Sequence, residues 1–218
     1  MIRVVESLDY SQKEWNQFFS EKGESWRDKD YRFLAQVFEL SNFFGTLLDV
    51  GCGLGDGEIF LKENCNNISE IYACDFSSQA IETCRNNKKI SNTHFFVHDL
   101  MTQKFSQTFD CVICLQTLEH LPNPNKAFKT IYEAAEKLLI VSTPYKNRRP
   151  DKNHLWSFDE NDFNEYNGQW IIAQEGLNIF WLFDKSGTGA TFKQNKNINS
   201  NFKKLVLDFK YFLKKTMR

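Results

Sequence analysis

Short apolar runs alternate with helical patterns along the middle of the chain. Five runs rich in β-branched, leucine and aromatic residues stand at positions 47–50, 71–75, 93–97, 109–115 and 139–145. Runs of this length are typical of strands buried on both faces of a parallel sheet. Between the last two runs, residues 127–135 place their apolar side chains on one helical face. The alternation predicts an α/β domain with a parallel sheet between layers of helices.

Two more strands are expected after these runs. Residues 170–173 and 178–183 are apolar and stand on either side of a turn at Gly176. Such closeness in sequence predicts an antiparallel pair. Ahead of them, residues 157–160 (Ser-Phe-Asp-Glu) have the pattern of a capping box, which predicts the start of a helix.

The two ends of the chain differ from its centre. Residues 9–40 are rich in aromatic and charged side chains, and from Tyr31 the apolar positions 34, 37, 38 and 40 follow helical spacing. We therefore expect an N-terminal helical cap over 1–40 and the sheet domain over 41–189. Residues 190–218 hold eight Lys or Arg residues against one Asp, with apolar positions at helical spacing, and are expected to form a basic amphipathic tail.

The first apolar run passes into a glycine-rich turn. Asp49 is followed by Gly51, Gly53 and Gly55, and a helical pattern begins directly afterwards. A strand, a glycine turn and a helix in this order let a ligand approach backbone amides without interference from Cβ atoms. A dinucleotide-binding turn would need a third glycine where this chain has Asp56.

The sequence Asp49-Val-Gly-Cys-Gly-Leu-Gly55 closely resembles motif I of the class I S-adenosylmethionine (SAM) dependent methyltransferases. The run Leu118-Glu-His-Leu121 before a proline is similar to a motif of small-molecule members, including quinone O-methyltransferases, and the loop that follows the fifth run resembles those of quinone- and sugar-modifying enzymes. The resemblance covers residues 44–185. It implies a Rossmann-like seven-stranded sheet of six parallel strands and one antiparallel strand, with helices on both faces.

The resemblance also implies a SAM site. Asp75 stands 20 residues after Gly55, where the family places an acid on the ribose hydroxyls, and Phe76 would border the adenine. Asp99, after the third strand, would meet the adenine amino group. The complete set of expected cofactor-binding residues is Asp49, Gly51, Cys52, Gly53, Gly55, Asp75, Phe76, Asp99, Leu100, Leu115 and Gln116.

Three side chains are candidates for catalysis. Transfer of a methyl group to a hydroxyl requires the hydroxyl proton to leave, and a general base assists this step by roughly 10²–10⁴-fold. His154, in the loop after the fifth strand, is the first candidate because histidine is the natural base near neutral pH. His120 and Glu119 are the alternatives. His154 could instead be a loop histidine without a role, and His120 could pack under the loop.

We expect no metal site, and the cysteines do not change this expectation. The chain has six of them, and only Cys111 and Cys114 have a spacing that suits a metal. Residues three apart on a strand point to opposite faces of the sheet, so these two thiols should not share an ion. The expected role of the cysteines is burial in the core.

The sequence gives less information about the molecule that accepts the methyl group. The basic loop with Arg148 and Arg149 suits a phosphorylated or nucleotide-linked sugar, because guanidinium forks match phosphate geometry. Two alternatives stay open: a quinone or lipid acceptor at a membrane surface, and a non-catalytic SAM-binding protein that docks a partner. The acidic balance of residues 1–189 argues against a nucleic-acid partner.

Location and assembly have few signals in the sequence. No apolar run approaches the roughly 20 residues that span a bilayer, and the start has no signal-peptide pattern. We expect a cytoplasmic protein. Its basic tail could hold it at the inner face of the membrane or against another protein, and the oligomeric state is left open.

Overall fold

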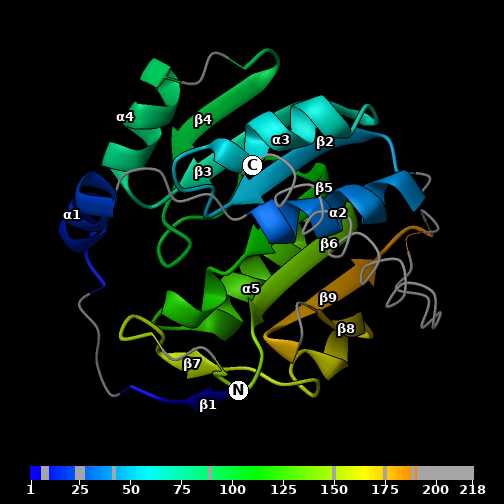
Figure 1. The fold of residues 1–218 in the computed structure, drawn as a ribbon. Helices are drawn as coiled ribbons and strands as arrows, with labels where there is room; N and C mark the ends of the chain where they lie inside the picture. The colour runs from blue at the N-terminus through cyan, green and yellow to red at the C-terminus, as the bar shows by residue number, and fades with distance from the viewer. Residues whose placement is uncertain are drawn as a thin grey trace, which may run out of the picture.

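A computed structural model describes residues 1–5, 10–22, 28–40, 43–87, 90–148, 151–173, 176–187 and 190. The expected tail, apart from Ala190, lies outside the described residues, as does Arg149. Within the described part the chain forms one seven-stranded sheet between helices and a separate two-stranded ribbon (Figure 1). None of the described helices combines the length and the hydropathy that crossing a bilayer requires.

The sheet has the expected topology. Its strands, from one edge to the other, are β4 (Thr93–Val97), β3 (Ile68–Asp75), β2 (Gly45–Val50), β5 (Phe109–Leu115), β6 (Ala135–Pro144), β9 (Asn178–Asp184) and β8 (Gln169–Ala173). Strand β9 pairs antiparallel with both neighbours, and the other pairs are parallel. The predicted six parallel strands and one reversed strand are therefore confirmed.

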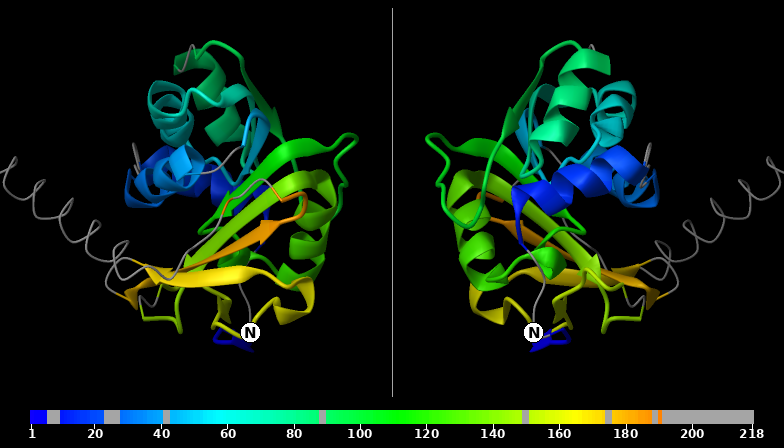
Figure 2. Two further views of the ribbon diagram at one scale, coloured as in Figure 1. Left: turned by 90° about the vertical axis from the view of Figure 1, so that its right-hand side faces the viewer. Right: turned by 90° about the vertical axis from the view of Figure 1, so that its left-hand side faces the viewer.

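Helices cover both faces of the sheet (Figure 2). On one face lie α2 (Asp28–Leu40), α3 (Asp56–Asn64) and α4 (Ser78–Asn87), with α1 (Gln12–Lys22) against α4. On the other face lies α5 (Pro124–Ala134), which begins at a proline and is capped by the Asn123 side chain. Two 3₁₀ turns, η1 (Leu118–His120) and η2 (Asn164–Tyr166), complete the set.

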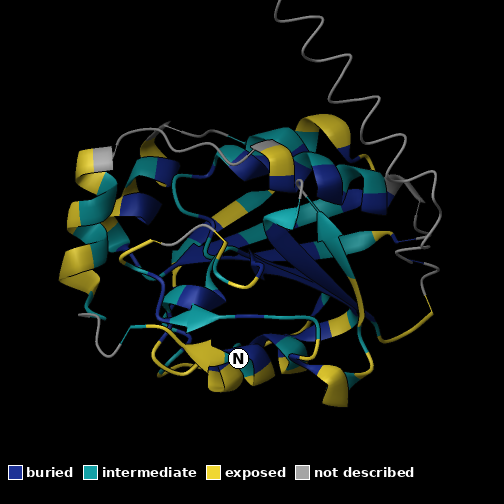
Figure 3. Cartoon of the chain, turned by 60° about the horizontal axis from the view of Figure 1, so that its bottom comes forward, coloured by how far each residue is buried: buried dark blue, intermediate teal, exposed yellow. Residues whose placement is uncertain are grey.

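The pleat of the strands divides the core into two layers. Leu47 and Ile71 point to the face that carries α2 and α3, whereas Leu48 and Val112 point to the face that carries α5. All four side chains have no exposed surface. Figure 3 shows the central strands as the most buried part of the molecule. Burial on both faces explains why these strands are continuous apolar runs in the sequence.

The N-terminal segment is not wholly helical as expected. Strand β1 (Ile2–Arg3) pairs antiparallel with β7 (Trp156–Ser157), and the Val4 amide donates to Leu155 O at 2.8 Å. The expected helix at 157–160 is also wrong. There the chain turns, with the Asp159 amide donating to Asp162 Oδ2 at 2.8 Å, because these acids bond to nearby amides instead of starting a helix.

A buried polar contact anchors the cap helix α2 to the sheet. The Tyr31 hydroxyl donates to Asp49 Oδ2 at 2.8 Å. Gly57 of α3 makes room for this contact, because a Cβ there would overlap the Tyr31 ring. Glu58 has no exposed surface. Burial, and next the carboxylate of Asp49, raise the pKa of Glu58 well above its ordinary value.

This buried acid predicts a pH-dependent stability. Between the unfolded pKa of Glu58, about 4.3, and its raised folded value, the folded state binds one more proton than the unfolded state. The stability contributed by neutral Glu58 is therefore lost as pH rises through this window. We expect Glu58→Gln, which cannot ionise, to gain stability relative to wild type as pH increases from 5 to 8 in urea denaturation.

The control is Glu63→Gln, on the exposed face of α3. Its stability difference from wild type should not grow with pH. A difference for Glu58→Gln that stays constant across the same range would contradict a neutral Glu58.

Candidate cofactor and acceptor site

A cavity of about 510 Å³ lies where β2, β3, β5 and β6 end. Ligands of open α/β sheets bind outside the carboxyl ends of the strands, and this volume is in the usual range for small-molecule sites. The loops after these four strands form most of the wall. The helix α1 adds an aromatic part with Trp15, Phe18 and Phe19. The cap and the sheet domain therefore both contribute to this site.

The glycine turn forms one end of the cavity. Gly51, Gly53 and Gly55 have φ values of 83°, 56° and 78°, in the left-handed region that favours glycine. A Cβ on Gly51 would overlap the Thr117 side chain, so the turn can pack against the loop after β5 only with glycine here. A Cβ on Gly53 would lie 3.3 Å from the Phe19 ring, so this part of the turn lies close against α1.

Asp75 holds the turn in place from the next strand. Its Oδ2 accepts from the Gly53 amide at 3.0 Å, and its Oδ1 accepts from the Ser77 amide at 2.8 Å. The side chain lines the cavity although the residue is only 8% exposed. The neighbouring Phe76 ring stacks on Tyr10 with centroids 4.7 Å apart. A carboxylate and an aromatic ring beside a glycine turn have the chemistry to hold a ribose and a base.

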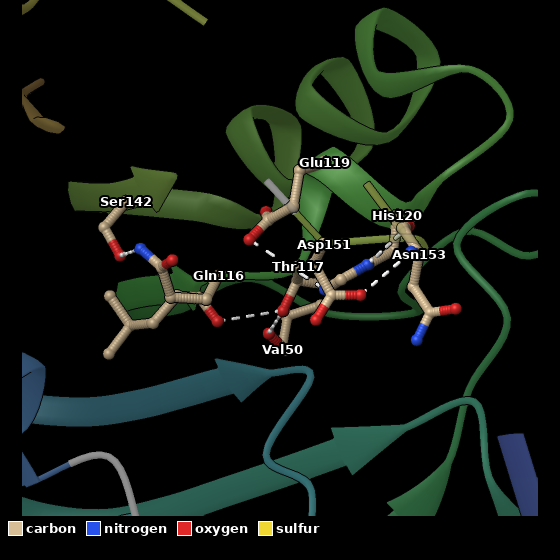
Figure 4. Close-up of polar contacts among 9 residues, drawn as sticks. Val50, Gln116, Thr117, Glu119, His120, Ser142, Asp151 and Asn153 are labelled. Carbon is tan, nitrogen blue, oxygen red and sulfur yellow. Dashed lines mark hydrogen bonds and ion pairs between the residues drawn. The ribbon is translucent and has the colours of Figure 1, made fainter. Parts of the chain in front are cut away.

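Eight of the expected cofactor residues line this cavity: Gly51, Cys52, Gly53, Asp75, Phe76, Leu100, Leu115 and Gln116. The Gln116 amide also donates to Ser142 Oγ at 3.1 Å (Figure 4). The other three, Asp49, Gly55 and Asp99, lie outside the lining. Asp49 contacts Tyr31, and Gly55 lies against Cys84 and Phe95.

Asp99 serves the turn that follows β4. Its carboxylate accepts from the Met101 amide at 2.8 Å and from Thr102 Oγ1 at 2.7 Å. The Tyr10 hydroxyl also donates to it, at 3.3 Å. These bonds fix the turn that contains Leu100. Asp99 therefore helps to position Leu100, which lines the cavity, without lining the cavity itself.

The three catalytic candidates meet in the wall of the same cavity. Glu119 and His120 belong to η1, and His154 comes from the loop after β6. One ligand-type atom from each side chain lies within 4.8 Å of the other two, and the two imidazole rings are 5.0 Å apart. Glu119 has no exposed surface, and His154 is 9% exposed. Glu119 and His120 thus form one compact group with His154, which is 34 positions after His120 in the sequence.

Hydrogen bonds fix this group in place. The Leu155 amide donates to Glu119 O at 2.8 Å, and the Trp156 indole donates to Leu121 O at 2.8 Å. His120 Nδ1 lies 2.9 Å from Asn153 O. Figure 4 shows Glu119, His120 and Asn153 converging from the two loops. The loop after β6 is therefore fastened to the loop after β5 at three points.

Some lining residues had no signal in the sequence. Asp30 of α2 and Asn178 of β9 meet at 3.3 Å, Asn178 Nδ2 donating to Asp30 Oδ1. Asp151 also lines the cavity. Their positions depend on how the cap helix and the reversed strand pack, which no local pattern records.

The described lining is acidic. It includes Asp30, Asp56, Asp75, Glu119 and Asp151 but only one Lys or Arg, Lys29. Arg148 does not reach the cavity. Its guanidinium lies 4.8 Å from the centroid of the Tyr145 ring and donates to Gly176 O at 3.0 Å. Among the described residues, the basic loop therefore gives no phosphate contact inside the cavity.

Comparison with known proteins agrees with this architecture. Residues 47–137 match the family model described as a methyltransferase domain. The chain is 26% identical over 159 residues to tRNA N(3)-cytidine methyltransferase METTL6 of Homo sapiens, covering 67% of this chain and 52% of that protein. It is 25% identical over 147 residues to (S)-coclaurine N-methyltransferase of Thalictrum flavum subsp. glaucum, covering 65% and 41%. The chain thus spans about half the length of these relatives.

Solved structures share the fold. The N-methyltransferase NodS from Bradyrhizobium japonicum, in complex with S-adenosylhomocysteine, superposes with a TM-score of 0.64 at 14% identity, over 80% of this chain and 98% of that one. Magnesium protoporphyrin IX methyltransferase from Synechocystis, with bound SAM, gives a TM-score of 0.61 at 15% identity, over 84% and 100%. The family match identifies residues 47–137 as a methyltransferase domain, and the strand order, with its glycine turn and Asp75, has the fold of the class I SAM-dependent methyltransferases.

Proposed function

We propose that this chain transfers the methyl group of SAM to a hydroxyl of a small polar acceptor. The observation that carries the proposal is that one cavity joins the glycine turn and Asp75 to the group of Glu119, His120 and His154. A cofactor end and a proton-accepting end in one enclosure are what methyl transfer to oxygen requires.

At the cofactor end, the chain offers matching partners for SAM. The glycine turn, the Asp75 carboxylate and the Phe76 ring line the cavity and suit the amino-acid part, the ribose and the adenine, respectively. SAM supplies a methyl group already activated on a sulfonium. The protein has to align the acceptor with it and exclude water. The aromatic side chains of α1 are placed to do the latter.

At the acceptor end, the cluster would hold the hydroxyl and remove its proton. His154 and His120 come from two loops that are bonded to each other, so their spacing is set before an acceptor arrives. Such preorganisation reduces the ordering that must occur during the reaction. His154 remains the first candidate for contact with the acceptor.

A sugar hydroxyl is the first acceptor class to test. The acidic lining suits a neutral polyol better than a phosphorylated sugar, because Arg148 is engaged elsewhere. An amine is the second candidate, since the same carboxylates would attract a cation, and relatives include N-methyltransferases by name. tRNA is a third acceptor to test, because another relative is a tRNA methyltransferase by name. Quinols and a non-catalytic role complete the alternatives.

Asp75→Asn should weaken SAM binding. Asn lacks the negative charge of Asp75, and a hydrogen bond to a charged group contributes about 1.5–3 kcal/mol. Calorimetry on the full chain measures the loss of SAM affinity. Glu133→Gln, on the exposed surface of α5, should leave SAM affinity unchanged. Absence of SAM binding by wild type at millimolar concentration would contradict the proposal.

His154→Ala should keep SAM affinity and lose at least about 10²-fold in kcat. The assay uses labelled SAM with a panel of sugars, nucleotide sugars, quinols, amines and tRNA. His94→Ala is the matched control, because His94 is an exposed histidine on β4. A wild-type kcat in His154→Ala would remove His154 from the reaction. SAM binding with no transfer to any acceptor would favour the non-catalytic alternative.

A further inference from the structure

We propose that Glu119, His120 and His154 bind a divalent transition-metal ion at the acceptor end of the cavity. This inference rests on the proposed function, because the ion would supply the contact with the acceptor. It departs from the expectation from sequence, which was that the chain has no metal site. Two imidazoles and one carboxylate are a ligand set found in catalytic zinc sites that keep an open position.

The distances suit one ion. Each side chain offers one ligand-type atom, and the three atoms lie within 4.8 Å of one another. His120 Nε2 is 3.9 Å from Glu119 Oε1. Two atoms that are each about 2.1 Å from a tetrahedral ion lie about 3.4 Å apart. A pair at 4.8 Å would therefore have to close by about 1.4 Å when the ion binds, a movement within the reach of small side-chain rotations.

The hydrogen bond of His120 assigns its ligand atom. Asn153 O, 2.9 Å from Nδ1, is a carbonyl and can only accept, so Nδ1 must carry the proton. The lone pair of the neutral ring is then on Nε2, the atom that faces Glu119. A ligating histidine whose other nitrogen donates to a backbone carbonyl is the usual outer-shell arrangement at metal sites, since it fixes tautomer and ring orientation.

The surroundings also suit a cation. Glu119 has no exposed surface, and a buried carboxylate is best stabilised by a cation or by several donors. Asp151 adds a further carboxylate to the wall nearby. All three proposed ligands line the cavity, so the open coordination positions of the ion would face the acceptor. An ion here would bind an acceptor oxygen directly and favour the loss of its proton, so the two histidines would act on the acceptor as ligands of the ion and not as free bases.

Imidazole ligands favour a first-row transition metal over magnesium or calcium, which prefer oxygen. Zn²⁺ is therefore the first ion to test, and Co²⁺ is its spectroscopic substitute. The full chain, treated with EDTA and dialysed, is titrated with Co²⁺ and followed by its visible absorption, and Zn²⁺ binding follows by competition. We expect one ion per chain, bound through nitrogen and oxygen, and a melting temperature that rises with Zn²⁺.

Variants test the ligands. Glu119→Gln, His120→Ala and His154→Ala should each weaken Co²⁺ binding by at least about 10-fold, whereas His94→Ala should bind as wild type. Circular dichroism checks that each variant folds. Because Glu119 is fully buried, His154→Ala is the second variant if Glu119→Gln fails to fold. Loss of the Zn²⁺-dependent rise in melting temperature is a readout that packing alone would not give.

Three results would overturn the inference: no binding at millimolar Co²⁺, binding that all three ligand variants retain, or an absorption band typical of cobalt bound to a cysteine thiolate. SAM binding measured by calorimetry on the metal-free protein separates the two proposals. SAM binding without metal binding would refute only the metal site. Metal binding without SAM binding would refute the proposed methyl transfer.

Discussion

The site depends on the parallel register of four strands. β2 ends beside both β3 and β5, with Val50 opposite Cys74 and Cys114, and β5 ends beside β6, with Leu115 opposite Ser142. The loops that follow these strands therefore emerge at one edge of the sheet. The glycine turn, Asp75, η1 and the loop with His154 are separated widely in sequence, and this register brings them to the same edge of the sheet.

Packing around the His154 loop connects the N-terminus to the same site. The loop is bonded to η1 on one side, and on the other side Val4 and β1 pair with its continuation at 155–157. The N-terminal strand, η1 and the loop itself thus hold His154 in its buried position. A loop with these contacts on both sides keeps the catalytic candidates in position before any ligand binds, which is the condition for precise acceptor alignment.

Much of this fold could be predicted from the sequence because its signals are local. Buried parallel strands are short apolar runs, and the turn needs glycines at positive φ, so both are visible in consecutive residues. Asp75 could be found by its spacing from Gly55. The helix expected at 157–160 failed because Asp159 and Asp162 satisfy nearby amides in a turn instead. Strand β1 has only two residues, too few for any periodic pattern.

The inner arrangement of the site could not be predicted from the sequence. Asp99 stands at the expected position after β4, yet it bonds to its own turn, and only the three-dimensional structure shows this. Likewise, Glu119, His120 and His154 were separate candidates for one role, and their meeting as a possible ligand set depends on bonds between two distant loops. Residue type indicated the chemistry here, and long-range packing decided the geometry.

We propose that one cavity holds the cofactor at the glycine turn and presents it to the Glu119, His120 and His154 group. A crystal structure of the full chain with S-adenosylhomocysteine would test this arrangement. We expect ribose hydroxyls on the Asp75 carboxylate, adenine beside Phe76, and the sulfur on the side of the cavity that faces His154. A ligand bound elsewhere, or one whose sulfur points away from this group, would contradict the proposal.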